Sequence, residues 1–119
     1  MRTMTINVAD ISKTDLLESD GIELRKAMFK AFSKDHDLYY DDDDTDFKLI
    51  LNFEDIILYA SPFFLASIGF FVLNFNEEYY LNTIKVINLT PIGEDIYNFV
   101  YRYSMSMKSQ FKISTYEGE

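Results

Sequence analysis

The segment from Ile56 to Asn76 carries no charged residue, and this feature constrains the fold more than any other in the chain. A segment of this length and apolarity can cross a lipid bilayer as a helix. However, Pro62 interrupts it, and no Lys or Arg flanks it closely enough to orient it in a membrane. We therefore predict no membrane span, but the end of a buried strand, a loop and a buried helix, in that order.

The composition of the chain excludes several classes of function. Its 119 residues suffice for one domain, residues 1–119, with a core over about 4–107 and a polar tail or edge strand over 108–119. Hydrophobic residues make up 48%, so the chain must collapse into a core. A net charge of −9 opposes binding to nucleic acid or anionic membranes, and the absence of Cys excludes disulfides and thiolate metal sites. The start, MRTMTINVAD, lacks the apolar run of a signal peptide, so we predict a cytoplasmic protein.

Short apolar runs predict the strands. Residues 4–8 alternate between apolar and polar, which is typical of a strand with one buried face. The runs 47–53 and 83–89 are also strand-like, and the first predicts a central strand covered on both faces. Phe111 and Ile113 indicate a short edge strand in the tail. Because strands alternate with helices, we predict an α/β fold with a mostly parallel or mixed central sheet of about four strands and three main helices.

The helices are predicted from apolar spacing and from residues typical of helix starts. Asp20 and Glu23 have the spacing of a capping box ahead of the first helix. Ser61 and Thr90 each precede a Pro, so we predict that each is the N-cap of a helix, the second and the third. The second helix is expected to end near Phe75. The third helix has one apolar stripe, formed by Ile92, Ile96, Phe99, Val100, Tyr103 and Met107.

No motif in the sequence supports catalysis or metal binding. The acidic segment Asp35–Asp46 fails the EF-hand spacing, because counting from Asp41 the sixth position is Asp46 instead of Gly and the twelfth is Asn52 instead of Glu. We interpret this segment as a solvated loop that also holds His36, the only His in the chain. A Gly-rich phosphate loop is absent from the sequence. We therefore predict no metal, no cofactor and no enzymatic activity.

Ser61 and the second helix favour an interaction with a partner. A phosphate on a Ser at a helix start is held by the converging backbone N–H groups and adds about −1.5 to −2 charges. The alternative is a structural cap, which stabilises a helix by about 1 kcal/mol. Phe63, Ser67 and Phe70 lie on a stripe away from the main apolar face, which indicates either a contact surface or a helix buried on both sides. Gly69 in this helix predicts close backbone packing.

Four stretches of the chain occur in an order that resembles the STAS-like domain family of unknown function, relatives of the STAS anti-sigma-factor antagonists. They are DGIELRKAMFKAF, LILNFEDI, ASPFFLASIG and IKVINLTPIGEDI. The resemblance covers residues 6–103 and implies a STAS-like fold. In the antagonists, a Ser at the strand–helix junction is phosphorylated by a cognate anti-sigma factor, which is a kinase with a histidine-kinase-type ATPase fold. Phosphorylation ends the binding of the antagonist to that kinase. Ser61 falls on this position, so the resemblance implies a phosphorylation site there.

The resemblance therefore implies a non-enzymatic regulatory module that binds a histidine-kinase-type ATPase or an anti-sigma-like protein. The predicted contact surface comprises the loop from Glu54 to Tyr59 and the helix residues after it, and its predicted partner-binding residues are Glu54, Asp55, Tyr59, Ser61, Phe63, Ser67 and Phe70. Two alternatives belong to other classes. One is a domain that senses a small molecule or nucleotide at the same helix start, and the other is a structural homodimer built on the second helix.

Overall fold

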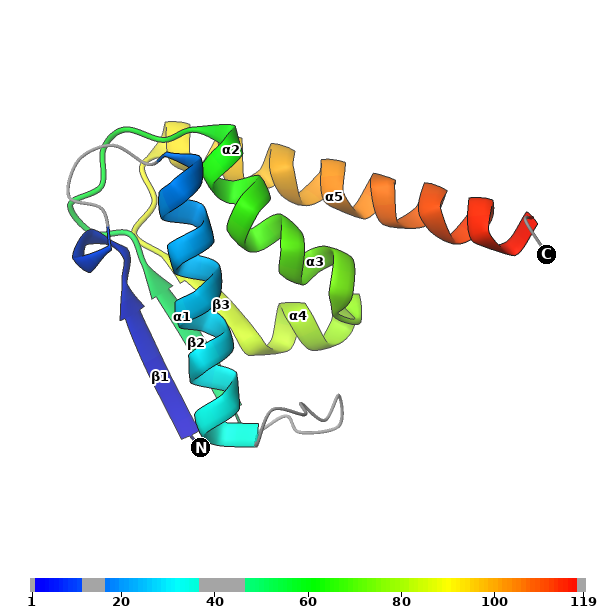
Figure 1. Cartoon of the computed structure of the whole chain (residues 1–119). Helices are drawn as coiled ribbons and strands as arrows, with labels where there is room; N and C mark the ends of the chain where they lie inside the picture. The colour runs from blue at the N-terminus through cyan, green and yellow to red at the C-terminus, as the bar shows by residue number, and fades with distance from the viewer. Residues whose placement is uncertain (1, 12–16, 37–46, 118–119) are drawn as a thin grey trace.

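The computed structural model describes residues 2–11, 17–36 and 47–117. In these ranges strands and helices alternate along the chain, which confirms the α/β fold class (Figure 1). The strands are β1 (Arg2–Asn7), β2 (Phe47–Asn52) and β3 (Ile84–Ile87). The helical elements are η1 (Val8–Asp10), α1 (Glu18–His36), α2 (Ser61–Phe64), η2 (Leu65–Gly69), α3 (Phe70–Asn74), α4 (Glu77–Thr83) and α5 (Pro91–Glu117).

The strands of the described residues form one parallel sheet in the order β1-β2-β3. The sequence predicted about four strands, and the fourth, at Phe111 and Ile113, is wrong because α5 continues as a helix to Glu117. Between Gly93 and Glu117 the sequence contains no Gly or Pro, so no residue of these types ends the helix earlier. Residues 108–117 of the predicted polar tail or edge strand therefore belong to the second half of a long helix.

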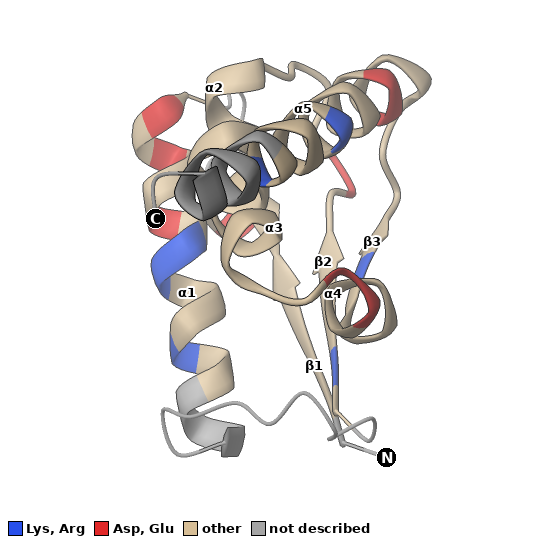
Figure 2. Ribbon diagram, turned by 90° about the vertical axis from the view of Figure 1, so that its right-hand side faces the viewer, with Lys and Arg blue, Asp and Glu red and all other residues tan. Residues whose placement is uncertain are grey.

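One face of this sheet is covered by helices, and Figure 2 shows α1 and α3 on the same side of the strands. In β2, Phe47, Leu49 and Leu51 are fully buried, while Lys48 and Ile50 between them are half-buried. The prediction that this strand is covered on both faces is therefore wrong for the described part of the chain. The prediction rested on the apolar run 47–53, and in its sequence LIL Ile50 stands between two buried residues. Ile50 is, however, the only apolar residue of β2 on the outer face.

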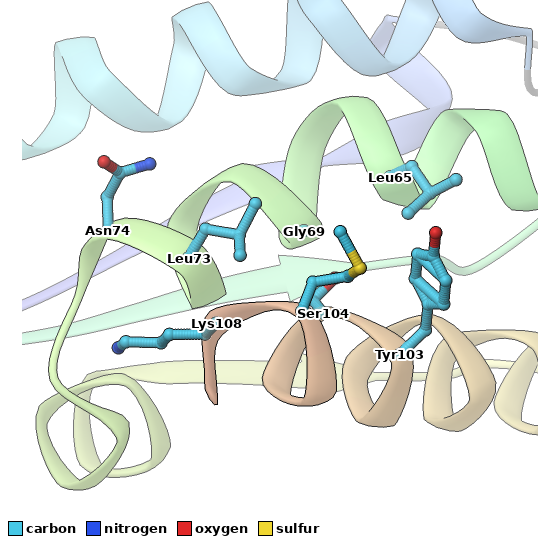
Figure 3. A pocket seen from close by; sticks show the side chains of 8 residues that line it. Leu65, Gly69, Leu73, Asn74, Tyr103, Ser104 and Lys108 are labelled. Carbon is cyan, nitrogen blue, oxygen red and sulfur yellow. The ribbon is translucent and has the colours of Figure 1, made fainter. Parts of the chain in front are cut away.

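The uncharged segment forms a continuous helical stretch over residues 61–74, in which η2 is a π-helical turn between α2 and α3. This confirms the predicted second helix. A Cβ atom built on Gly69 would lie 3.0 Å from Ser104 Oγ on α5, so the predicted close packing at this glycine is also confirmed. Figure 3 shows Gly69 and Ser104 facing each other. Among the described residues, no helix has both the length and the apolarity that crossing a membrane requires.

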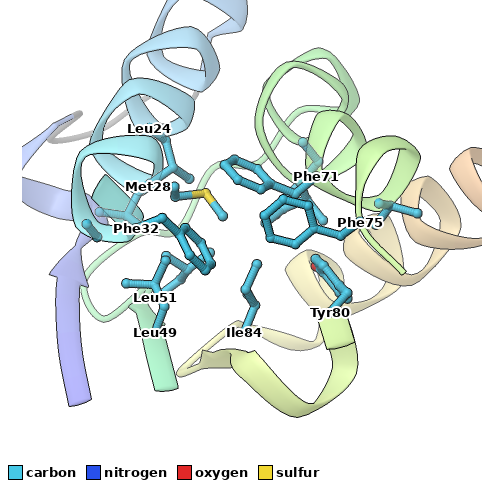
Figure 4. Close-up of a cluster of buried hydrophobic side chains, with 14 of the residues drawn as sticks. Leu24, Met28, Phe32, Leu49, Leu51, Phe71, Phe75, Tyr80 and Ile84 are labelled. Atoms are coloured by element: carbon cyan, nitrogen blue, oxygen red, sulfur yellow. The ribbon is translucent and has the colours of Figure 1, made fainter. Parts of the chain in front are cut away.

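The aromatic residues of this helical stretch lie at the centre of the core (Figure 4). The side chain of Phe71 is fully buried, and its ring centroid lies 4.9 Å from that of Phe29 and 5.0 Å from that of Phe75. Side chains from four further elements surround it, and those labelled in Figure 4 are Leu24, Met28, Phe32, Leu49, Leu51, Tyr80 and Ile84. Burial inside the domain thus explains why the core-facing residues of this segment are uncharged, whereas Ile57, Leu58, Leu65 and Leu73 of the same segment are exposed.

The first helix starts earlier and ends later than its capping-box spacing predicts. Asp20 is not the N-cap but lies in the first turn, where its Oδ2 accepts a 3.0 Å hydrogen bond from the backbone N–H of Leu17. An acidic side chain at this position satisfies a free donor at the helix start. The helix runs through Asp35 and His36, which were predicted in the acidic loop. The rest of that acidic segment, residues 37–46, lies outside the described residues.

Helix α4 was not predicted, although the sequence carries a signal for it. Asn76 is its N-cap, and its Oδ1 accepts a 3.2 Å hydrogen bond from the backbone N–H of Tyr79. Glu77 and Glu78 follow in the first turn, where negative charge is favoured by the helix dipole. An Asn followed by two acidic residues is therefore the pattern that should have indicated a helix start.

Tyrosine hydroxyls connect α4 to α5. The hydroxyl oxygens of Tyr80 and Tyr97 lie 2.8 Å apart, and the hydroxyl of Tyr101 donates a 2.8 Å hydrogen bond to Glu77 Oε2. Burial raises the pKa of Tyr80 and of Tyr97, and burial together with the neighbouring Glu77 carboxylate raises the pKa of Tyr101 to about 12. All three phenols are therefore neutral near pH 7 and keep the proton that these hydrogen bonds need.

Candidate functional site

The carboxyl ends of the three strands lie at one edge of the sheet, at the same end of the molecule as the first turns of α2 and α5 (Figure 1). Parallel sheets commonly bind ligands at this edge. An Asn stands at or just after the end of each strand, and these residues are Asn7, Asn52 and Asn88. Asn52 Nδ2 donates to Asn7 Oδ1 (3.1 Å), and Asn88 Nδ2 donates to Asn52 Oδ1 (2.9 Å). We call these three amides the asparagine row.

Two turns beside the asparagine row require a left-handed backbone. Asp55 has φ of 71° and Asn88 has φ of 64°. Asp and Asn adopt this conformation more readily than other residues with a side chain. Asn52 Oδ1 also accepts a 3.0 Å hydrogen bond from the backbone N–H of Glu54. The central Asn thus holds both of its neighbours and the start of the loop that follows β2.

Asn52→Ala should lower the free energy of unfolding by about 1–2 kcal/mol, because it removes three hydrogen bonds at a partly exposed site. Urea unfolding followed by circular dichroism measures this change. Asn98→Ala, at an exposed position on α5, is the control and should change stability by no more than about 0.5 kcal/mol. Equal stability of the two variants would show that the asparagine row does not hold the edge together.

The loop between β2 and α2, residues 53–60, presents both acidic and apolar side chains to solvent. Ile57 is 72% exposed and Leu58 is 55% exposed, and Glu54 and Asp55 before them are also exposed. Large apolar side chains that stand adjacent and exposed on a loop are unusual unless they are covered by something else. We call Glu54, Asp55, Ile57, Leu58 and Ser61 the loop surface.

Tyr59 anchors this loop to the rest of the domain. Its hydroxyl donates to the carbonyl oxygen of Ile56 (2.9 Å) and accepts a 3.3 Å hydrogen bond from the backbone N–H of Thr90. Its ring lies nearly parallel to that of Phe64 and so close to Gly93 that a Cβ atom there would come within 2.5 Å of it. Tyr59 is therefore a positioning residue beneath the loop surface, and the loop is held in one shape before any partner arrives.

Ser61 is the first residue of α2 and not its N-cap, so the predicted position is wrong by one residue. The N-cap is Ala60, which has an extended backbone, and no side chain caps this helix start. The Ser61 side chain is half-buried, and Pro62 in the first turn has no N–H to offer. The corresponding prediction for α5 is confirmed, because Thr90 Oγ1 accepts a 3.1 Å hydrogen bond from the N–H of Gly93.

Phe63 and Ser67 do not lie on an outer face, which corrects the predicted contact stripe. Both are fully buried, and Ser67 Oγ donates a 2.8 Å hydrogen bond to the carbonyl oxygen of Phe63. Phe70 is half-buried beneath the guanidinium of Arg25, which lies 5.0 Å from the ring centroid. The reason is that α1 covers this side of the helical stretch, with Gly21 against the backbone of Phe63. Of the two alternatives, burial on both sides is the correct one.

The structure thus brings together Glu54, Asp55, Tyr59 and Ser61 in one loop and its helix start, and it leaves Phe63, Ser67 and Phe70 out of that surface. The asparagine row was not predicted from the sequence. A signal for it exists, since an Asn follows the apolar run of each strand in the sequences TIN, LILN and KVIN. Carboxyl ends of parallel strands meet at one edge, so this repetition could have predicted the row.

Within the described ranges, no group of three or more His, Asp or Glu side chains is arranged to hold a metal ion. Glu54 and Asp55 are therefore acidic residues of a surface and not part of a ligand cage in the described part of the chain. The amide groups of the asparagine row offer both donors and acceptors. What this edge can do chemically is to form hydrogen bonds and apolar contacts with another molecule.

The family model described as STAS-like domain of unknown function (DUF4325) matches residues 20–94. The match covers more than half of the chain, so this protein belongs to that family. No curated protein and no solved structure gives a significant match. The matched residues include the loop surface, and of the asparagine row they include Asn52 and Asn88.

Proposed function

Taking membership of the STAS-like family as the premise, we propose that this protein is a non-enzymatic regulatory module that binds a protein partner through its loop surface. The observation that carries the proposal is the exposure of Ile57 and Leu58 on a loop that Tyr59 fixes in place. Exposed apolar side chains on a rigid support lose little conformational entropy when they are covered, which favours binding.

The chemistry of the loop surface defines the partner. Glu54 and Asp55 border the apolar pair, so a fitting partner has an apolar pocket with basic side chains beside it. The net charge of −9 also favours a basic partner surface. A histidine-kinase-type ATPase or an anti-sigma-like protein is the partner class that the likeness to the antagonists favours.

Phosphorylation of Ser61 is the switch we propose for this contact. The Ser61 oxygen would attack the γ-phosphorus of ATP held by the partner, the bond to ADP would break, and the hydroxyl proton would pass to a base of the partner. The phosphate would add about −1.5 to −2 charges beside Glu54 and Asp55. That charge must lose water when the loop surface is covered, so phosphorylation should weaken binding.

The test is capture of the partner from the native host with tagged wild-type protein and two variants. Leu58→Asp should reduce capture at least tenfold, because it places a charge in the contact. Leu81→Asp is the matched control, since Leu81 is 50% exposed on α4 against 55% for Leu58, and it should leave capture unchanged. Mass spectrometry of the captured protein shows whether it is an ATPase of this class. Equal capture by all three proteins would overturn the proposal.

The phosphorylation step is tested separately with the captured ATPase and ATP. Intact-mass analysis should show one added phosphate on the wild-type protein and none on Ser61→Ala. An unmodified wild-type protein would remove the switch and leave the binding module in place.

The asparagine row favours a second candidate, which is sensing of a small molecule or nucleotide. Its amides lie at the sheet edge where parallel folds bind ligands, and exposed Asn7 and Asn88 are open to such a molecule. A thermal-shift screen with nucleotides separates the candidates, because a sensing domain is stabilised by free ligand and a protein-binding module is not. A nucleotide that stabilises the wild type but not Asn88→Ala would favour sensing.

A further inference from the structure

A second surface, distinct from the loop surface, is an apolar groove between the helical stretch 61–74 and α5 (Figure 3). Its volume is about 630 Å³. Gly69 forms its floor, and Leu65, Leu73, Tyr103 and Met107 form its walls. The groove arises because Leu65, Gly69 and Leu73 follow one another at intervals of four residues, so a residue without a side chain lies between two that project.

The groove continues along α5 as an exposed apolar stripe. The sequence predicted that the apolar residues of this helix face one way, but only Val100 of that set is fully buried. Ile92 and Phe99 extend the line of Tyr103 and Met107, and the rings of Phe99 and Tyr103 stack at 6.3 Å between centroids. The named residues of the groove and stripe, which we call the α5 patch, are Leu65, Leu73, Ile92, Phe99, Tyr103 and Met107.

The size of the α5 patch matches what a stable dimer needs. Its six residues are 43–69% exposed. With about 200 Å² for each of these side chains when free, they offer about 600 Å² per copy, or about 1,200 Å² in a symmetric pair. The area of about 1,200 Å² for the pair lies at the lower end of the range for specific protein–protein interfaces. The area of about 600 Å² for one copy lies at the upper end of the range for apolar patches on monomers, which is about 300–600 Å².

The charge on α5 favours a second copy of this chain over a partner of opposite charge. The whole chain has a net charge of −9. In contrast, α5 holds three acidic residues (Glu94, Asp95, Glu117) and three basic residues (Arg102, Lys108, Lys112), so its formal charge is zero. Two like-charged copies repel least where such a neutral helix is the contact, and a basic partner would gain nothing there.

The shape and polarity of α5 set the relative orientation of two α5 helices that pack against each other. Its second half extends beyond the other helices in Figure 1. Asp95 lies near its start and Arg102 near its middle, and both flank the stripe, whereas the ammonium of Lys108 donates to the carbonyl oxygens of Val72 and Phe75 in its own domain. In an antiparallel pair, Asp95 of one helix approaches Arg102 of the other, and opposite ends of the helix dipoles also meet. The stripe from Ile92 to Met107 has its midpoint near Phe99.

We propose that the α5 patch is the interface of a homodimer in which two α5 helices pack antiparallel around a two-fold axis near Phe99. Each copy fills the other's groove with side chains of its own stripe, as a self-complementary interface requires. The α5 patch and the loop surface share no residue, so a dimer carries two copies of the loop surface.

Oligomeric state is measured by analytical ultracentrifugation of the full chain from 5 to 500 µM. The wild type should be a dimer at the upper concentrations, and Phe99→Asp should raise the dissociation constant at least 100-fold. Leu58→Asp is the matched control, because Leu58 is 55% exposed against 59% for Phe99 but lies on the loop surface. It should leave the dimer intact. Circular dichroism confirms that both exposed-site variants stay folded.

The antiparallel orientation of the two helices is tested by disulfide cross-linking. Since the sequence has no Cys, only the introduced Cys residues can form disulfides. Phe99→Cys should cross-link to itself under mild oxidation, since a residue near a two-fold axis meets its own copy. Ile92→Cys and Met107→Cys should each stay uncross-linked alone but form a mixed disulfide when combined. A parallel pair would instead cross-link Ile92→Cys to itself, and that result would overturn the antiparallel arrangement.

A wild-type monomer at 500 µM, or equal dissociation of Phe99→Asp and Leu58→Asp, would overturn the dimer itself. These outcomes are separable from a failure of the proposed function. Phe99→Asp should still capture the partner of the loop surface, while Leu58→Asp should still dimerise.

Discussion

Phe71→Ala should lower the free energy of unfolding by about 3–5 kcal/mol, which is a large part of the stability of a domain of this size. The ring is fully buried and contacts the rings of Phe29, Phe32, Phe70 and Phe75. Removing it leaves a cavity where α1 and α3 meet, and neighbouring side chains can fill such a cavity only in part. Urea denaturation measures the loss, and the near-ultraviolet signal of the aromatic cluster should weaken.

Phe29→Ala is the matched control for Phe71→Ala. Phe29 belongs to the same aromatic cluster, with its centroid 4.9 Å from that of Phe71, but its side chain is 42% exposed. Its removal should cost about 1–2 kcal/mol, because less apolar surface returns to water. If both variants lost the same stability, the cluster would not be centred on Phe71 as the structure places it.

Gly21→Ala should destabilise the protein by about 2–3 kcal/mol, although Ala forms helices better than Gly by about 1 kcal/mol. A Cβ atom at position 21 would lie 2.4 Å from the carbonyl oxygen of Phe63 and 3.0 Å from Ala66 Cβ. The nearest atom belongs to the backbone of the neighbouring helix, so it cannot rotate away. α1 and α2 must therefore move apart, and every contact along their interface weakens.

Two variants separate this packing effect from helix propensity. In Gly69→Ala the added Cβ atom would lie 3.0 Å from a side-chain oxygen, Ser104 Oγ, and 3.6 Å from the nearest backbone atom. The neighbouring hydroxyl can shift, so this change should stay within about 1 kcal/mol of the wild type. Ser19→Ala, exposed on the same helix as Gly21, should change stability by about 0.5 kcal/mol at most. A Gly21→Ala protein more stable than the wild type would mean that the helices are not in contact at that glycine.

Local chemistry accounts for the parts of the fold that were predictable. Apolar runs at 47–53 and 83–89 gave two of the strands, and the Thr90 cap gave the start of α5. Pro62 in the first turn placed the helix start to within one residue. The family resemblance was also readable, since it rests on the order of motifs along the chain. Each of these features depends on residues that are close together in sequence.

The candidate site was predictable only in part. Glu54, Asp55, Tyr59 and Ser61 were found because they belong to one loop and the helix start that follows it. Ile57 and Leu58 were included only as members of the loop from Glu54 to Tyr59 and were not named individually, because they are apolar like the buried residues on either side. Whether an apolar loop residue is exposed depends on which element covers it, and helical spacing gives no information about a loop.

The sequence by itself determined where β1, β2, β3, the helical stretch 61–74 and the start of α5 form, because period, caps and turn residues act over a few positions. Only the tertiary structure decided which helix faces are covered. Phe63 and Ser67 are buried because α1 packs against them, whereas Phe99 and Tyr103 stay exposed because no described element of the chain covers them. Burial depends on contacts between elements far apart in the chain, and the amphipathic pattern of one helix does not specify its neighbours.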